Sequence, residues 1–328
     1  MTDPIAGTTQ AHGTAGNGAP VPAPSGEDWI HDPAHHVPHH HHEPVSERRP
    51  HPVAVSVQDV TKVFGGSGAK AGTTALEHVS FDIRMGEFVS LIGPSGCGKS
   101  TLLRLVSGLV DSTAGAITVN GLTPAEARRR RQFGIVFQSP VLFDWRTVSE
   151  NIALPLEVFG EPKKKITPRV DELAALVGLE KFRNHYPWQL SGGMQQRVAI
   201  ARALTFAPPF LLMDEPFGAL DLITRDRMAA ELLRIWSNTP GTTVMFITHS
   251  IPEAVLLSDR VVVMGAHPGR VEKVVDIELP RPRTEAVRES RAFFEYDTEL
   301  RRMLIEAERG AGPAEDGAPD TGPGVHAG

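Results

Sequence analysis

The chain has 328 residues, of which 41% are hydrophobic and 22% are charged, with a formal net charge of −6 at pH 7. These values are ordinary for a folded protein with a real core, and the negative charge provides no basic field to attract nucleic acid or an anionic membrane. A single cysteine excludes an internal disulfide framework, residues 1–10 lack the regions of a signal peptide, and no run approaches the roughly 18 apolar residues of a membrane-spanning helix. We therefore expect a cytosolic protein of one or two domains that does not bind nucleic acid.

Residues 1–52 and 311–328 differ in composition from the rest of the chain. Both are rich in Gly, Pro and Ala and have too few apolar side chains to offset the entropy of ordering, so they are expected to be disordered tails. Residues 31–44 contain a histidine tract. Neutral imidazoles bind Zn²⁺, Ni²⁺ or Cu²⁺, but the interleaved prolines favour a solvated tail over a metal site. Between the tails we expect one folded unit over 53–280 and a helical extension over 281–310.

The first functional motif follows an apolar run, F-V-S-L-I at 88–92, which predicts a buried strand. A glycine-rich loop comes next, and helical patterning begins near Lys99. This order predicts a phosphate-binding loop, because glycines let successive N–H groups converge on phosphate oxygens and the helix adds its positive end. Lys99 is expected to reach the β- and γ-phosphates of a nucleoside triphosphate, and the Ser100 hydroxyl to ligate Mg²⁺. The expected nucleotide-binding residues of the loop are Gly93, Pro94, Ser95, Gly96, Cys97, Gly98, Lys99, Ser100 and Thr101.

Two helices are predicted next. Thr167-Pro168 predicts the N-cap and first turn of one helix, which Gly178 ends. A second helix follows the stretch L-S-G-G at 190–193. Ser191, Gly192 and Gly193 thus form a helix amino terminus whose N–H groups and hydroxyl suit an anion, while an ordinary N-cap without a ligand stays open as the alternative.

Further along the chain, two apolar runs end in polar residues. The run at 210–213 predicts a strand that ends in Asp214 and Glu215. Asp214 suits the coordination of a metal beside the phosphate loop, and Glu215 is expected to polarise a water for attack on the γ-phosphate. The run at 243–248 delivers His249 toward the same phosphate. Beyond them, 284–309 is patterned as one helix that packs back on the domain or contributes to a dimer contact.

Two ordinary classes of phosphate-loop protein fit poorly. A GTPase needs an N-K-x-D element that reads guanine, and the sequence has none. A small-molecule kinase needs a lid and an acceptor site, and it leaves L-S-G-G-M-Q unexplained.

With these residues assembled, the chain resembles an ATP-binding cassette (ABC) ATPase over roughly 53–275. The elements that carry the resemblance are the phosphate loop, Gln138 in V-F-Q-S-P, the signature L-S-G-G-M at 190–194, the strand and acids at 210–215, A-L-D at 219–221 and the switch histidine His249. They occur in the family's order. The resemblance implies an α/β fold: a P-loop NTPase cassette with a RecA-like core, an antiparallel β subdomain and a helical signature subdomain over about 139–208.

The resemblance also implies roles for individual residues. Phe64 is expected to stack on adenine, and Asp221 to belong to the ATP site. Catalysis is expected to involve Glu215, His249, Gln138 and Lys99, with Mg²⁺ held by Ser100, Gln138 and Asp214. In this family two subunits meet head to tail, so the signature of one copy closes over the γ-phosphate held by the other. The homodimer, or a paired ATPase subunit, would therefore share two ATP sites. Met194 replaces the usual glutamine of the signature, and Ser250 replaces an acid common after the switch histidine.

The motifs F-D-W-R-T-V-x-x-N-I and T-H-x-x-x-E-A-V-x-L-x-D-R resemble those of importer ATPases for nitrate, sulfonate, taurine or pyrimidine-type precursors. This similarity implies a transport-coupled ATPase (translocase), peripheral on the cytoplasmic face of the membrane. Permease subunits would dock near 139–150, where Phe143 and Trp145 would be exposed at the contact, while a core position in the helical subdomain stays open for each ring. An extracytoplasmic solute-binding protein would act indirectly. Two alternatives stay open: a soluble ABC ATPase, and a nucleotide-dependent metal-binding regulator not coupled to transport.

Overall fold

The computed structural model describes residues 52–65 and 72–310. The two predicted tails, including the histidine tract at 31–44, lie outside the described residues. Within the described part of the chain, no helix is both long and apolar enough to cross a bilayer.

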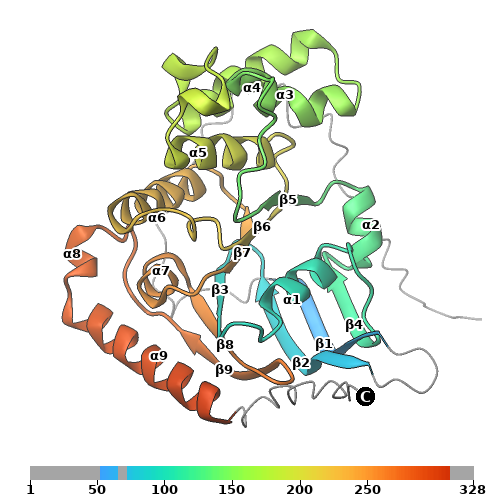
Figure 1. The fold of residues 1–328 in the computed structure, drawn as a ribbon, viewed down its shortest axis with the longest axis vertical. Helices are drawn as coiled ribbons and strands as arrows, with labels where there is room; N and C mark the ends of the chain where they lie inside the picture. The colour runs from blue at the N-terminus through green and yellow to red at the C-terminus, as the bar shows by residue number, and fades with distance from the viewer. Residues whose placement is uncertain (1–51, 66–71, 311–328) are drawn as a thin grey trace, which may run out of the picture. The chain divides into compact units, whose positions relative to one another are not determined.

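A six-stranded sheet organises this part of the chain, with the strand order β5-β6-β7-β3-β8-β9 (Figure 1). Its strands are β3 (Phe88–Ile92), β5 (Phe133–Val136), β6 (Phe210–Asp214), β7 (Thr243–Ile247), β8 (Arg260–Gly265) and β9 (Arg270–Asp276). Neighbouring strands are parallel except β8 and β9. Every residue of β3 and β7 is buried, as expected for strands of a parallel sheet that is covered on both faces.

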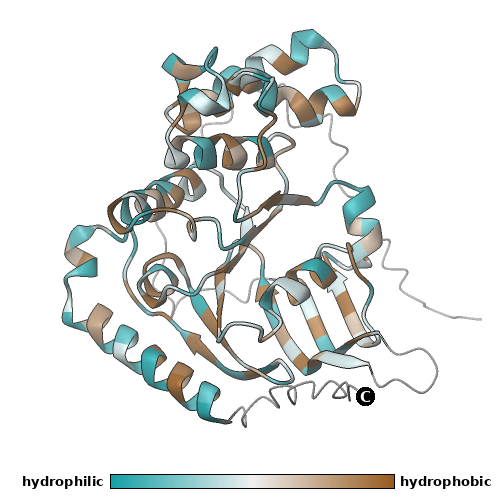
Figure 2. Ribbon diagram, viewed as in Figure 1, coloured by the Kyte–Doolittle hydropathy of each residue, from teal (hydrophilic) through white to brown (hydrophobic). Residues whose placement is uncertain are grey.

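The alternation of side chains along β3 divides the core into two parts. Phe88 and Ile92 enter one hydrophobic cluster, with residues of α5, α6 and α9. Val89 and Leu91 enter the other, with α1 and the second sheet. Figure 2 shows the central strands as mainly hydrophobic. Because successive side chains of a strand point to opposite faces, this burial on both sides fixes the register of β3 firmly.

A second, antiparallel sheet has the order β2-β1-β4. Its strands are β1 (Val53–Phe64), β2 (Thr73–Arg84) and β4 (Ala114–Val119). The helix α1 (Lys99–Val106) contacts strands of both sheets, and α2 (Pro124–Arg129) packs against β4. The expected combination of a mixed α/β core with an antiparallel β part is confirmed.

A helical part follows β5 and holds α3 (Val148–Val158), α4 (Lys163–Leu176), the short turns η2 (Glu180–Phe182) and η3 (Pro187–Gln189), and α5 (Gly192–Ala203). The predicted start of α4 at Thr167-Pro168 is wrong. The helix begins five residues earlier, after the N-cap Pro162, and Pro168 lies inside it. Since proline lacks an N–H, Pro168 costs α4 one hydrogen bond, the one that the Lys164 carbonyl would otherwise accept. Gly178 follows the C-cap with φ 67°, so the predicted end of this helix is confirmed.

The remaining helices are α6 (Leu222–Ser237), α7 (Ile251–Leu257), α8 (Glu285–Arg288) and α9 (Arg291–Gly310). The single helix predicted over 284–309 is therefore two, because Ser290 breaks the run and its hydroxyl accepts from Phe293 N at 3.2 Å. Of the two alternatives left open for this segment, packing back is what the structure has: α9 contacts α7 and β8 and buries Phe293, Leu300 and Met303.

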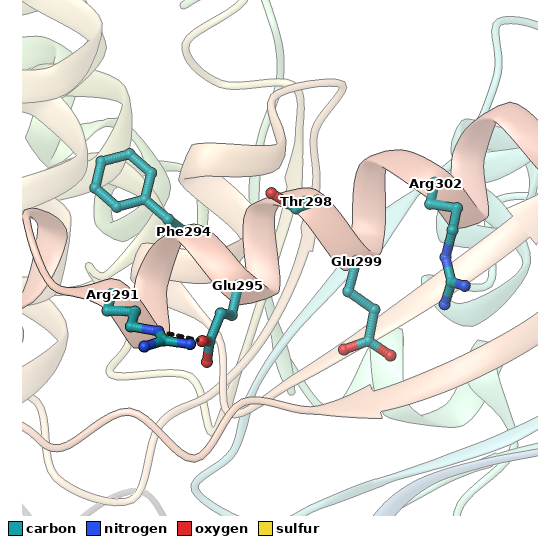
Figure 3. Close-up of a pocket in the computed structure, with 6 residues that line it drawn as sticks. All are labelled: Arg291, Phe294, Glu295, Thr298, Glu299 and Arg302. Carbon is teal, nitrogen blue, oxygen red and sulfur yellow. Dashed lines mark hydrogen bonds and ion pairs between the residues drawn. The ribbon is translucent and has the colours of Figure 1, made fainter.

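The outer face of α9 carries charged side chains and one exposed ring, Phe294 (Figure 3). Arg291 donates to Glu295 at 2.7 Å, one helical turn along. The residues that line this shallow surface all come from α9. They make an ordinary solvated helix face and bring no second element to form a binding site.

Arg283 fastens the segment after β9 to α7. Its guanidinium is buried and donates to the carbonyls of Val255, Leu256 and Ser258 at 2.6–3.0 Å and of Ile277 at 3.1 Å. Three of these carbonyls lie at the end of α7, where a helix leaves its last C=O groups unpaired.

We expect Arg283→Met to lower the free energy of unfolding by about 3 kcal/mol, because it leaves several buried carbonyls without a donor. Urea unfolding of the full chain measures the loss. The matched control is Arg291→Met, whose side chain is 93% exposed and should change stability little. An Arg283 variant as stable as this control would show that the capping contacts are dispensable.

Candidate active site

The predicted phosphate loop lies between β3 and α1, at the carboxyl end of the central strand. Open α/β sheets bind their ligands at this edge. Cys97 is fully buried, and its thiol lies against Gly93, where an added Cβ would come within 2.7 Å of Sγ. The side chain of Cys97 therefore points into the protein, and only its backbone is left for a ligand.

Two glycines of the loop have left-handed backbones, Gly96 with φ 78° and Gly98 with φ 88°. They differ in the space around them. A Cβ on Gly98 would lie 2.5 Å from Leu76 Cδ2 and 3.0 Å from Ala75 O, whereas one on Gly96 would meet nothing within 4 Å. Gly98 is also the N-cap of α1, without a side-chain cap, so the first N–H groups of this helix stay available to an anion.

We expect Gly98→Ala to destabilise the protein more than Gly96→Ala. Both variants force alanine into the left-handed region, at roughly 1–2 kcal/mol, but only Gly98→Ala adds a clash, for a further 1–3 kcal/mol or so. Thermal unfolding without nucleotide compares the two. Equal losses would mean that Leu76 moves aside without cost.

Lys99 is buried at the foot of the loop, only 7% exposed. Its ammonium donates to the carbonyls of Gly93 at 2.8 Å and Pro94 at 2.9 Å. Among the described residues, no carboxylate lies within ion-pair distance of it. A buried cation that rests on neutral carbonyls favours an anion as its partner, which fits the nucleotide phosphates predicted for this loop.

Ser100 and Asp214 come together from positions 114 residues apart. The Ser100 hydroxyl donates to Asp214 Oδ1 at 2.9 Å. Burial raises the pKa of the Asp214 carboxyl, an effect that the hydrogen bond from Ser100 opposes. A hydroxyl beside a half-buried carboxylate is the donor set that a hard cation such as Mg²⁺ prefers, so these side chains fit that ion.

Glu215 follows Asp214 with a backbone φ of 46°, a conformation that costs a non-glycine residue strain. Its N–H donates to Ile247 O of β7 at 3.0 Å. The turn carries Glu215 to His249, with 3.4 Å between Glu215 Oε2 and His249 Nδ1. The two predicted catalytic side chains are thus neighbours, and the His249 ring remains half exposed.

Gln138 and Phe64 lie on the margins of this group. The Gln138 amide lies against the turn that follows Glu215, since a Cβ on Gly218 would be 3.0 Å from Nε2. Phe64 ends β1, is 41% exposed and pairs with Thr73 of β2. Ala75 of β2 lies close to Gly98, since an added Cβ on Gly98 would be 3.0 Å from Ala75 O. The pair of β1 and β2 therefore reaches the phosphate loop.

Ser191, Gly192 and Gly193 are not brought to the phosphate loop of the same chain. Ser191 is the N-cap of α5 and accepts from Met194 N at 3.4 Å. A Cβ on Gly192 would meet Leu220, and one on Gly193 would meet Thr224 at 3.0 Å. Figure 1 shows α5 near α6 and well away from α1. The predicted site residues therefore form two separate groups.

Asp221 lies beside the second group, as the N-cap of α6. Its carboxylate accepts from Thr224 N at 3.0 Å, and the Thr224 hydrogen bonds hold the pKa of Asp221 below its usual range. In this chain, Asp221 is used as a helix cap.

The sequence predicted no individual role for Arg225, Thr248 or Glu253, although Thr248 and Glu253 stand in the motif T-H-x-x-x-E that carries the importer resemblance. Glu253 is buried on α7, one turn after His249, and lies 3.6 Å from Arg225 of α6. The signal in the sequence that could have indicated Glu253 is an acid four residues after the candidate catalytic histidine. Its partner is 28 positions away in the sequence, and only the fold brings the two together.

Comparison with known proteins agrees with this geometry. A profile of the ABC transporter family matches residues 76–218. An uncharacterized ABC transporter ATP-binding protein of Methanocaldococcus jannaschii is 45% identical over 252 residues, which cover 77% of this chain and 91% of the relative. The aliphatic sulfonates import ATP-binding protein SsuB of Bacillus cereus is 44% identical over 234 residues, which cover 71% of this chain and 90% of the relative.

Solved structures give the same picture. The ATP-binding cassette MJ0796, in a dimeric post-hydrolysis state bound to ADP and phosphate, is 36% identical with a TM-score of 0.58, over 68% of this chain and 98% of that one. The protein cbiO1 of Clostridium perfringens, part of the ABC transporter complex cbiONQ, is 27% identical with a TM-score of 0.63, over 78% of this chain and 98% of that one.

Proposed function

The chain belongs to the ABC transporter family of ATP-binding proteins and is an ATPase; from that premise we propose that two copies work as a pair that drives a separate membrane permease. The observation that carries the proposal is the division of the predicted site residues into two groups that do not meet within one chain. One group surrounds the phosphate loop and holds Ser100, Asp214, Glu215 and His249. The other is the amino terminus of α5.

In the proposed reaction, water attacks the γ-phosphate of ATP and ADP and phosphate leave. Glu215 accepts a proton from the attacking water, because its carboxylate ends a buried strand beside the phosphate loop. His249, 3.4 Å from Glu215, orients that carboxylate and the γ-phosphate end of the nucleotide. Lys99 turns from the loop carbonyls to the phosphates, where its charge gains an anionic partner.

Mg²⁺ would be held by Ser100 and Asp214, with Gln138 at the margin. When bound, the ion neutralises charge on the phosphate oxygens. The 2.9 Å hydrogen bond between Ser100 and Asp214 supports their shared role.

The second half of each site would come from the partner copy. The exposed Ser191 hydroxyl and the free N–H groups of α5 suit the γ-phosphate held on the other chain. The dimeric state of the MJ0796 cassette supports this arrangement. ATP between the two halves would convert its binding energy into closure of the pair.

The permease would dock on the helical part, near 139–150. Trp145 there is 72% exposed and contacts the half-buried Phe143, with 4.9 Å between ring centroids and 42° between the ring planes. An exposed tryptophan supported by a half-buried ring favours a protein contact. The likeness to SsuB favours an importer whose solute is an aliphatic sulfonate or a similar small anion. The solute-binding protein would then act through the permease, and this chain would lie at the cytoplasmic face of the membrane.

Uptake by whole cells tests the proposal. We expect cells that carry the chain with its permease to accumulate an aliphatic sulfonate, and Trp145→Ala to abolish accumulation while the purified variant still hydrolyses ATP. The control is Trp188→Ala, another exposed ring, which lies outside 139–150. Normal uptake with Trp145→Ala would remove this segment as the docking site.

A further inference from the structure

Arg225 and Glu253 connect two segments that border the proposed catalytic residues. The first segment, 216–221, leaves Glu215 and ends at the cap of α6. The second, 248–250, carries His249 into α7. Both partners are largely buried, with side-chain exposures of 20% for Arg225 and 7% for Glu253.

Arg225 holds the first segment. Its Nη2 donates to the carbonyls of Gly218 and Leu220, each at 3.4 Å. The same segment is folded on itself, because Gly218 N donates to Glu215 O at 3.0 Å. The Nε–H of Arg225 is buried and makes no hydrogen bond within the described part of the chain, and this atom lies 3.6 Å from Glu253 Oε1.

Glu253 holds the second segment with its other oxygen. Oε2 accepts from the Thr248 hydroxyl at 2.5 Å, and that hydroxyl in turn accepts from Ser250 N at 3.0 Å. The Ser250 side chain accepts from Glu253 N at 3.4 Å. Thr248 and Ser250 flank His249; the Glu253 carboxylate holds Thr248 directly and reaches Ser250 only through the Thr248 hydroxyl. Ser250 is the N-cap of α7.

We propose that Arg225 and Glu253 form a positioning pair that keeps His249 in register with the segment after Glu215. The inference rests on the proposed function, because it assigns the pair to the same site. Neither side chain touches the reacting atoms. Their effect is transmitted through Gly218 and Leu220 on one side and through Thr248 and Ser250 on the other, so that the Glu215–His249 distance is set by both.

The proposal predicts a loss of turnover without a loss of ATP binding. Arg225→Met removes the charge and the contacts with 216–221, and Glu253→Gln removes the charge but keeps a carbonyl for Thr248. We expect each change to lower kcat by about 10-fold or more, because small displacements of catalytic groups are costly. The affinity for ATP and KM should stay within about 2-fold, since the phosphate loop is untouched.

A double-mutant cycle on the full chain tests whether the two act together. Arg225→Met with Glu253→Gln should be no slower than the slower single variant, within about 2-fold, because each single change already breaks the link. Multiplied losses in kcat would overturn the proposal, as would unchanged kcat or a rise in KM alone.

The matched control is another buried pair, Arg260 and Glu87, 2.6 Å apart at the opposite end of β3. Glu87→Gln should lower stability but not kcat per folded molecule. Circular dichroism gives the folded fraction of each variant, by which kcat is corrected. If Glu87→Gln lowers kcat as much as Glu253→Gln, the effect is general destabilisation and the positioning role is wrong. A wild-type chain without ATPase activity would instead contradict the proposed function itself.

Discussion

Glu215→Gln is expected to abolish ATP hydrolysis, with a loss of at least about 100-fold, the usual effect of removing a general base. Glutamine keeps the shape of the side chain and its contact with His249 but accepts no proton from water. ATP binding should be unchanged, because Lys99 and the loop N–H groups are intact. A phosphate-release assay and a nucleotide-binding titration on the same sample measure the two effects.

The control for this change is Glu306→Gln on the exposed face of α9, which should hydrolyse ATP like the wild type. Hydrolysis by Glu215→Gln at the wild-type rate would remove Glu215 as the base. Loss of binding along with hydrolysis would instead mean that Glu215 supports the loop, through the strained turn at φ 46°.

Ser191→Arg is expected to block hydrolysis about as severely, by 100-fold or so, since it removes a hydroxyl donor and fills the space meant for a phosphate. Binding of ATP to one chain should stay within about 2-fold of the wild type, because Ser191 lies away from its own phosphate loop. Loss of the N-cap costs about 1 kcal/mol of stability, so the assays should be run well below the unfolding temperature of the variant.

Ser237→Arg, at the exposed carboxyl end of α6, tests whether an added arginine alone is harmful and should have no effect on hydrolysis. If Ser191→Arg loses binding in the single chain, the signature acts within one copy and the shared site is wrong.

The strands that carry the chemistry could be read from the sequence. Phe88–Ile92 forms a strand with the predicted bounds, and the runs beginning at Phe210 and Thr243 form strands that end within one residue of the expectation. Uninterrupted apolar runs of this length are typical of strands buried on both faces, and a parallel sheet needs such strands. The order of motifs then indicated the family, which the comparisons confirm.

Other features depend on contacts that no local pattern reports. Pro168 suits the first turn of a helix, yet α4 begins at Lys163, and Ile166 of the added turn packs against the core. Arg225 and Glu253 are ordinary charged residues of two helices until the fold buries them together. The direction of the Cys97 side chain, which is buried in the core, could not be predicted from its place in the loop.

Mixing two inactive variants tests the shared site most directly. Lys99→Met damages the phosphate loop, and Ser191→Arg damages the signature. In a mixed pair, one site combines the intact loop of one copy with the intact signature of the other. We predict that each variant alone is inactive and that the mixture regains hydrolysis. A mixture that stays inactive, although the two variants co-purify as a pair, would contradict a site built from two copies.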